Sequence, residues 1–213
     1  MLDTSSWSDL EKCATGLLSA AERRRSERFR FEQDRCTYVI AHALWRVLLG
    51  MATETLPDRV SLQFLPGGQP QLPGTGLTTS LSHSGPMALM AVGSVRALGI
   101  DIERCPTRVA MFELLRVICS DEERDILQAM PPERREWALL QLWTRKEAVL
   151  KAWGTGLGQA PSSFSALPGA LVVPPKGVDG EPCLTMELAL PEGQAGALAV
   201  SLDVLRHTLH ILA

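Results

Sequence analysis

The stretch LGIDIE at residues 98–103 constrains the fold most, because aliphatic residues alternate with other residues along it. Strict alternation is the period of a β-strand, in which successive side chains point to opposite faces. The aliphatic face must be buried, while Asp101 and Glu103 share the other face. Two neighbouring carboxylates repel each other unless a cation or a shared proton relieves them. The stretch is therefore either a core strand with a solvated outer face or one wall of a cation site.

The pattern around this strand predicts an α+β fold. Ser-x-x-Glu capping boxes open helical segments at Ser19 and Ser120, and a Pro- and Gly-rich connector at 65–76 must be loop. Helices are expected at 19–31, 34–50, 120–130 and 133–153, and strands at 78–82, 87–93, 97–103, 183–190, 196–204 and 207–213. The order helices, strands, helices, strands divides the chain near residue 105, which predicts an N-terminal lobe at 1–105 and a C-terminal lobe at 106–213.

Composition excludes several classes of protein. The chain has 21 Lys and Arg against 24 Asp and Glu, a net charge of −3, which argues against coating of nucleic acid by bulk positive charge. The five cysteines are scattered without a Cys-x-x-Cys pair, so neither a zinc site nor a disulfide framework is indicated. Neither a signal-peptide pattern nor an uninterrupted apolar run of about 18 residues is present. We expect a cytoplasmic enzyme or binding protein that contacts no membrane and no nucleic acid.

A second group of polar residues lies on the helix that includes LWTRKEAVLKAWG at 142–154. Trp143, Glu147 and Lys151 follow one another at intervals of four, so they line one side of the helix. Burial of Trp143 would place Glu147 at the margin of the core. The alternative is a common surface Glu–Lys pair. The glycines at 154–158 follow this helix rather than open one, which favours a C-terminal cap over a phosphate-binding loop.

Two further polar features leave both a functional and a structural interpretation open. His83 lies between two serines where an apolar strand meets a Gly-Pro turn, and with Ser82 it could bind a phosphate; no nucleophile-elbow pattern surrounds it. His207 and His210 point to opposite faces of a strand-like stretch and indicate no site. The arginines at 23–35 form either a solvated helix face or a grip for a phosphorylated ligand or an acidic protein partner.

In their order and spacing, LSHSG, LGIDIE and WTRKEAVLKAWGTGL resemble the motifs of the 4′-phosphopantetheinyl transferases of the surfactin-synthetase-activating (Sfp) type. The resemblance runs from about Ser19 to Phe164. It implies a pseudo-dimer of two similar α/β lobes, each a small, mainly antiparallel sheet packed with helices. The site would lie in the cleft between the lobes, and the protein would be a monomer.

The resemblance also implies an activity. Enzymes of this family transfer the 4′-phosphopantetheine arm of coenzyme A to a serine of an apo acyl or peptidyl carrier protein and release 3′,5′-ADP. By this resemblance, Asp101, Glu103 and Glu147 would hold Mg²⁺ on the pyrophosphate. Glu147, directly or through a metal-bound water, would take the serine proton, with Glu103 as the second candidate. Lys151 would neutralise the pyrophosphate and assist departure of the nucleotide.

Coenzyme A contacts follow from the same resemblance, with two departures from the family pattern. Ser82 and His83 would contact the nucleotide phosphates. The family commonly has Gly-Lys-Pro in the loop before these strands, whereas this chain has Gln69 in place of the lysine. The family also has two basic residues in the first helix that reach the 3′-phosphate. Arg25 matches one of them, whereas Glu22 occupies the position of the other, so Arg24 or Arg35 would have to compensate.

Two other classes of protein remain as alternatives at this stage. A metal-dependent nuclease also uses an acidic set with a lysine, but its second acid and lysine are two apart on a strand, whereas Glu147 and Lys151 are four apart on a helix. A non-catalytic module that binds carrier proteins or nucleotides is the other alternative, and retention of all three carboxylates and of Lys151 argues against it. Whether the carrier serves fatty acid, polyketide or non-ribosomal peptide synthesis is open, and an acidic carrier helix is a candidate partner for the arginines at 23–30.

Overall fold

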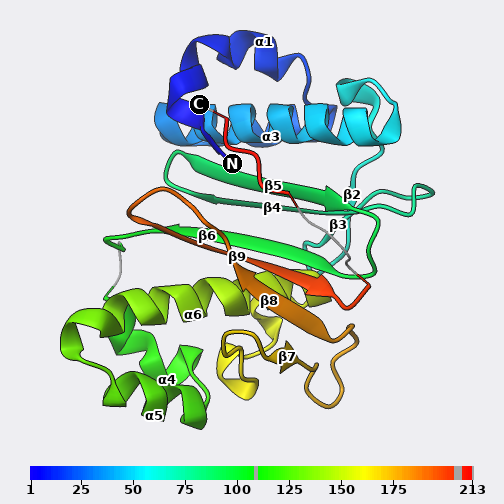
Figure 1. Ribbon diagram of the computed structural model, residues 1–213. Helices are drawn as coiled ribbons and strands as arrows, with labels where there is room; N and C mark the ends of the chain where they lie inside the picture. The colour runs from blue at the N-terminus through cyan, green and yellow to red at the C-terminus, as the bar shows by residue number, and fades with distance from the viewer. Residues whose placement is uncertain (108–109, 204–207, 213) are drawn as a thin grey trace.

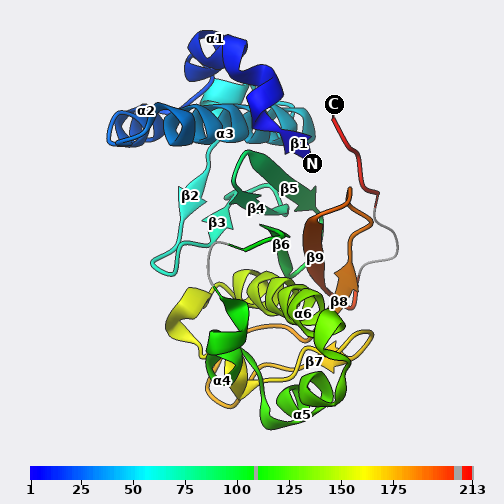
Figure 2. The same ribbon diagram turned by 90° about the vertical axis from the view of Figure 1, so that its left-hand side faces the viewer.

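The chain forms four stacked layers, two of helix outside and two of sheet inside (Figures 1 and 2). The computed structural model describes residues 1–107, 110–203 and 208–212. The first sheet has the order β1-β5-β4-β3-β2, and the second has the order β6-β9-β8-β7. All pairings between these strands are antiparallel. Two antiparallel sheets packed with helices confirm the predicted α+β class.

The first half of the chain contributes one outer helical layer and the first sheet. Its elements are β1 (Leu2–Asp3), η1 (Thr4–Leu10), α1 (Glu11–Thr15), α2 (Ala20–Ser26), α3 (Glu32–Thr53), η2 (Pro57–Arg59), β2 (Gln63–Phe64), β3 (Pro70–Gln71), β4 (Thr78–Ser84) and β5 (Met87–Gly93). The second half contributes the other two layers. Its elements are β6 (Leu98–Arg104), η3 (Met111–Leu114), α4 (Leu115–Ile118), α5 (Asp121–Ala129), α6 (Pro132–Trp153), η4 (Gly156–Gly158), η5 (Pro161–Ser163), β7 (Leu171–Val172), β8 (Cys183–Glu187) and β9 (Gln194–Ser201).

Most predicted elements are present, with shifted ends. Both capping boxes form, at Ser19 and at Ser120, and α6 ends at Gly154 in the left-handed conformation of a C-terminal cap. The first predicted helix is wrong beyond Ser26, because the chain turns before α3 begins at Glu32. The last predicted strand, at 207–213, is reduced to one bridge from Leu2 to Leu212 within the described residues. His207 lies outside the described residues.

The strand that carries Asp101 belongs to the second sheet by its hydrogen bonds. β6 pairs along its whole length with β9, and Asp101 lies opposite Ala197. This pairing places the LGIDIE strand in the second sheet, although its residues fall within the predicted N-terminal lobe at 1–105. The physical reason is that β9, with its small residues, supplies a full antiparallel partner. A division of the chain into two domains near residue 105 stays a prediction.

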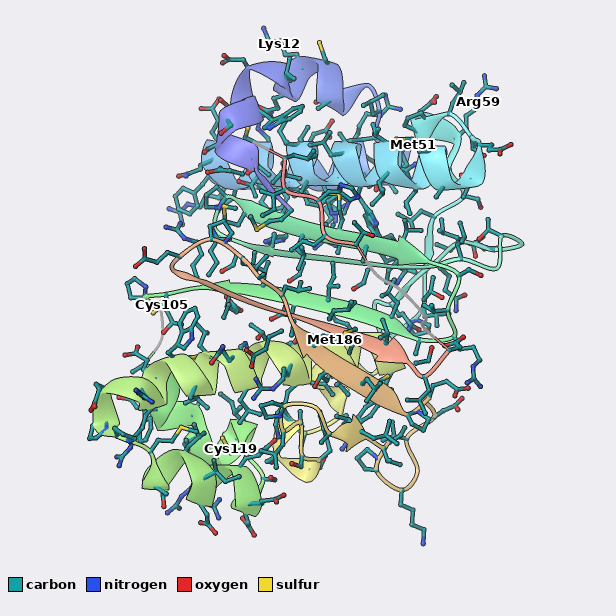
Figure 3. All side chains as sticks on the ribbon, in the orientation of Figure 1. Lys12, Met51, Arg59, Cys105, Cys119 and Met186 are labelled. Carbon is teal, nitrogen blue, oxygen red and sulfur yellow. The ribbon has the colours of Figure 1, made fainter. Side chains whose placement is uncertain are left out.

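Alternation along the inner strands sorts the core into layers. From β6, the aliphatic side chains of Leu98, Ile100 and Ile102 face the first sheet and pack with Leu89 of β5, and Met186 of β8 joins this cluster (Figure 3). The opposite face of the second sheet presents alanines of β9 to α6. Asp101 and Glu103 alternate with the aliphatic residues and so share the opposite face, as the sequence predicted, and Lys151 of α6 contacts Asp101 on that face.

The two halves repeat one construction, which supports a pseudo-dimer of similar lobes. Each half has a short helix that begins with a Ser-x-x-Glu capping box, followed by a helix of 22 residues. In each half the glutamate of the box binds a buried cation on the long helix. Glu22 binds Arg46 at 2.5 Å in the first half, and Glu123 binds Lys146 at 2.6 Å in the second.

By length and composition, α3 is also apolar enough to cross a membrane. Half of the most apolar 18-residue stretch of this helix is buried inside the protein. It packs against α1, η1, η2 and β5, and its buried residues include Arg46. The helix has the features of a core helix, which satisfies the same length and hydropathy criteria.

Candidate active site

The close packing of α6 on β6 depends on a glycine. A Cβ atom on Gly99 would lie 1.9 Å from the carbonyl oxygen of Ala148 and 2.6 Å from the nitrogen of Ala152. Any other residue there would therefore push the helix away from the strand. The close approach brings the helix residues Glu147 and Lys151 to the carboxylate face of β6.

Lys151 joins the helix to the strand. Its Nζ donates to Asp101 Oδ1 at 2.7 Å and to Ser82 Oγ at 2.8 Å, and Ser82 Oγ donates to the same carboxylate oxygen at 2.7 Å. Asp101 is 4% exposed, so its charge needs this cation. The structure thus brings together three of the predicted residues, and it uses Ser82 to orient Asp101 and Lys151.

Within the described part of the chain, two buried carboxylate oxygens beside this ion pair have no hydrogen-bond partner. They are Asp101 Oδ2 and Glu147 Oε1. Burial and the charges of Asp101 and Glu103 raise the pKa of Glu147 to about 7, although Lys151 opposes the rise. Burial and the charge of Asp101 also raise the pKa of Glu103, and hydrogen bonds from Ser84 and Trp143 oppose that rise. Three carboxylates therefore repel one another here in the absence of an added cation.

These residues fit a hard divalent cation in chemistry. The donors are carboxylate oxygens on stiff elements, which suit Mg²⁺, and the two unpartnered oxygens are free to bind it. Within the part of the chain that the structure describes, no three His, Cys, Asp or Glu side chains are gathered closely enough to hold a metal ion. The complete set of Asp101, Glu103 and Glu147 as metal ligands therefore stays a prediction.

A row of serines on β4 fixes the strand β6 from its open edge. Ser80 Oγ accepts a hydrogen bond from the backbone N–H of Ile100, and Ser84 Oγ accepts one from that of Arg104. Ser84 Oγ also donates to Glu103 Oε2 at 2.8 Å. Hydroxyl groups therefore take the place of a neighbouring strand and orient Glu103 together with its backbone.

A cavity of about 640 Å³ opens beside Glu147 and Lys151. Its walls come from α2, α3, β4, the loop at 67–70 and the end of α6, so both halves of the chain contribute. Four residues that can carry positive charge line it, namely Arg25, His42, His83 and Lys151. Aromatic rings line it too, from Tyr38, Trp45 and Phe64. Cationic groups and aromatic surfaces together suit a phosphorylated ligand with a planar ring.

Gln69, at the position of the family's lysine, closes one side of the cavity by binding the protein itself. Its Nε2 donates to the carbonyl oxygens of Ala152 at 3.1 Å and Lys151 at 3.4 Å, at the end of α6. Gly67 packs so tightly that a Cβ would lie 2.2 Å from the carbonyl oxygen of Gly154. The loop is therefore docked on α6 without the positive charge of a lysine.

The structure does not bring Arg35 to the cavity. Its guanidinium binds Glu11 at 2.7 Å and Glu32 at 3.6 Å, on the side of α1. Arg24 lines a different, shallow hollow with Arg25 and Arg28. The expectation that Arg35 contacts coenzyme A therefore has no support from the geometry, because its charge is already paired.

Sequence reasoning missed the roles of His42 and Lys146. Lys146 is fully buried, and beyond Glu123 it donates to the carbonyl oxygens of Pro161 and Phe164 at 2.8 and 2.7 Å. A signal was present, because Lys146 falls in the apolar helical stripe of Leu142 and Val149, where a lysine needs partners. A similar signal was present for His42, which lies one helical turn after Tyr38 on the same side of α3.

Comparisons with known proteins identify the family of this chain. Residues 97–176 match the family described as "4'-phosphopantetheinyl transferase superfamily". The 4′-phosphopantetheinyl transferase HetI of Nostoc sp. (strain PCC 7120) is 32% identical over 146 residues, which are 67% of this chain and 62% of HetI. The 4′-phosphopantetheinyl transferase AcpT of Salmonella typhi is 36% identical over 138 residues, which are 63% of this chain and 70% of AcpT. The chain therefore belongs to the 4′-phosphopantetheinyl transferase family.

The match does not extend over the whole of these relatives. This chain spans 62% of HetI, somewhat less than two thirds of its length. Among solved structures, the holo-[acyl-carrier-protein] synthase of Thermotoga maritima is 21% identical, with a TM-score of 0.36, over 50% of this chain and 62% of that one. Because the chain belongs to the 4′-phosphopantetheinyl transferase family, the alternative interpretation as a metal-dependent nuclease is disfavoured.

Proposed function

We propose that this protein transfers the 4′-phosphopantetheine arm of coenzyme A to a serine hydroxyl of an apo carrier protein and releases 3′,5′-ADP. The observation that carries the proposal is the meeting of Arg25, His83, Glu147 and Lys151 around one cavity. These residues come from three elements that lie far apart in the sequence. Membership of the family and the ion pair of Lys151 with Asp101 at 2.7 Å support the same activity.

In the proposed reaction, the serine oxygen forms a bond to the phosphorus that bears pantetheine, and the bond from that phosphorus to the oxygen of 3′,5′-ADP breaks. Glu147 accepts the serine proton, with Glu103 as the second candidate. Lys151 lies beside the carboxylates, and its positive charge would neutralise negative charge on the phosphate of the departing 3′,5′-ADP. Asp101, Glu103 and Glu147 would hold Mg²⁺, which would neutralise the pyrophosphate when bound.

We further propose that the enzyme is of the Sfp type and acts as a monomer, because both halves of one chain contribute walls to the cavity. Its partner would be an acyl or peptidyl carrier protein. A cytoplasmic location is part of the proposal, because the five cysteines are free thiols, which suit a reducing compartment.

The test is the mass gain of an apo carrier protein incubated with coenzyme A, Mg²⁺ and the enzyme. Glu147→Gln should abolish the gain and leave the fold intact, whereas Glu133→Gln, on the exposed first turn of the same helix, should leave it unchanged. No gain with acyl and peptidyl carriers alike would defeat the proposal. Turnover retained by Glu147→Gln would remove Glu147 from the catalytic set.

A further inference from the structure

The cavity holds one group whose contacts indicate a role that the family motifs do not assign. His42 lies on α3, its side chain is 13% exposed, and its ring lines the cavity. Its Nδ1 lies 3.2 Å from Glu22 Oε1. Among the described residues, its Nε2 has no hydrogen-bond partner.

The carboxylate of Glu22 determines which nitrogen of His42 carries a proton. Burial alone would raise the pKa of Glu22, but hydrogen bonds from His42 and Ser19 and the charge of Arg46 lower it to about 2. Glu22 is therefore ionised and accepts, so Nδ1 must donate to it. Its other oxygen, Oε2, is already bound by Arg46 Nε at 2.5 Å and by the N–H of Ser19 at 2.8 Å.

Packing fixes the imidazole ring as well. The ring lies on Tyr38, with 4.0 Å between ring centroids, and edge-on to Trp45 at 5.7 Å. The guanidinium of Arg25 lies over the ring of the same Tyr38, with its central carbon 5.7 Å from the ring centroid. Arg25 and His42 thus both contact the ring of Tyr38 and both line the cavity, and Nε2 of His42 remains available for a ligand.

We infer that His42, held by Glu22, is the second group that binds the 3′-phosphate of coenzyme A beside Arg25. In the bound complex the imidazole would lie between two anions, with its Nδ1–H on Glu22 and its Nε2 facing the phosphate. The Nε2–H then donates to a phosphate oxygen. Glu22, which stands where a basic residue was expected, acts as a positioning residue for this contact.

The two compensating residues expected from the sequence fit this task less well. Arg35 is paired with Glu11 on the side of α1, and Arg24 lines a separate hollow. His42 alone among these three lines the same cavity as Arg25, His83 and Lys151.

This inference rests on the proposed function, because it assumes coenzyme A as the ligand. The test measures the dissociation constants of coenzyme A and of 3′-dephospho-coenzyme A by calorimetry, without a carrier protein. His42→Ala should weaken coenzyme A binding about tenfold or more, the value of a hydrogen bond to a charged group, and should change dephospho-coenzyme A binding less than about twofold. His42→Arg should restore the preference.

Two further variants separate a positioning role from a structural one. Glu22→Gln should reduce the preference for coenzyme A in the same direction, whereas a purely structural role would weaken both ligands equally. Arg24→Ala should leave the preference unchanged. A loss of preference in Arg24→Ala, or an equal loss of both ligands in His42→Ala, would overturn the inference.

The outcomes also separate this inference from the proposed function. A wild-type protein that binds both ligands equally well overturns the inference, even if it transfers the arm. A wild-type protein that prefers coenzyme A through His42 but modifies no carrier leaves the inference standing and defeats the proposed function.

Discussion

Protonation of Glu22 should destabilise the first half of the molecule in a pH range where most proteins are still folded. The carboxylate has a folded-state pKa of about 2 against an ordinary value of 4.5. Because the folded-state pKa is the lower one, the ionised group stabilises the fold above about pH 4.5. That stabilisation is lost as the pH falls through 4.5 toward 2.

The size of the effect follows from the same two values. A difference between 4.5 and about 2 corresponds to about 3 kcal/mol of stabilisation at neutral pH. Between pH 6 and pH 3, about 2 kcal/mol of it should disappear. The side chain is 7% exposed, so solvent screening is small. Glu22→Gln cannot ionise and would leave Arg46 without its counter-charge, so it should be the less stable protein at pH 6.

The assay is urea denaturation of both proteins at pH 6, 5, 4 and 3, followed by tryptophan fluorescence. The stability gap between wild type and Glu22→Gln should narrow by about 2 kcal/mol from pH 6 to pH 3. Glu27→Gln is the matched control, because Glu27 is exposed at the end of the same helix and should give a gap below about 0.5 kcal/mol. A gap for Glu22→Gln that stays constant over the whole range would refute the reasoning.

Three further predictions follow from other contacts. Gly99→Ala should destabilise the fold by about 2 kcal/mol or more in urea denaturation, since its Cβ would lie 1.9 Å from Ala148 O; an unchanged midpoint would show that α6 can shift without cost. Lys146→Met should cost about 3–5 kcal/mol in the same measurement by leaving Glu123 buried without a cation, and adding Glu123→Gln should recover part of the loss. Asp101→Asn should remove the rise in melting temperature that Mg²⁺ and coenzyme A together produce in the wild type, and a variant that keeps this rise would exclude Asp101 from the ion site.

Local patterns predicted much of the fold. The alternation at 98–103 and the capping boxes at Ser19 and Ser120 act over a few residues, so the sequence displays them directly. The partner of β6 was not visible in this way. β9 lies about 95 residues further along the chain, and its small residues carry little pattern of their own.

In the candidate site as well, local motifs were predictable from the sequence, whereas contacts between distant segments were not. Asp101, Glu147 and Lys151 were predicted from motif order, and the structure places Lys151 against Asp101 at 2.7 Å. The serine contacts and the pairing of Arg35 with Glu11 depend on which strands and helices become neighbours. Charge alone suggested Arg35 as a ligand group, because a sequence shows a charge but not its partner.

The repeated construction of the two halves explains why Glu22 lies at the cavity at all. In the second half the pair is sealed, because Glu123 and Lys146 are both 0% exposed and the remaining lysine protons go to backbone carbonyls. In the first half the glutamate has a third partner, His42, whose ring reaches the cavity. In the second half, the buried pair of Glu123 and Lys146 therefore only stabilises the packing of the long helix. In the first half, Glu22 also holds His42, whose ring faces the cavity. A single buried carboxylate in the first half thus serves stability through Arg46 and, by our inference, recognition of the nucleotide through His42.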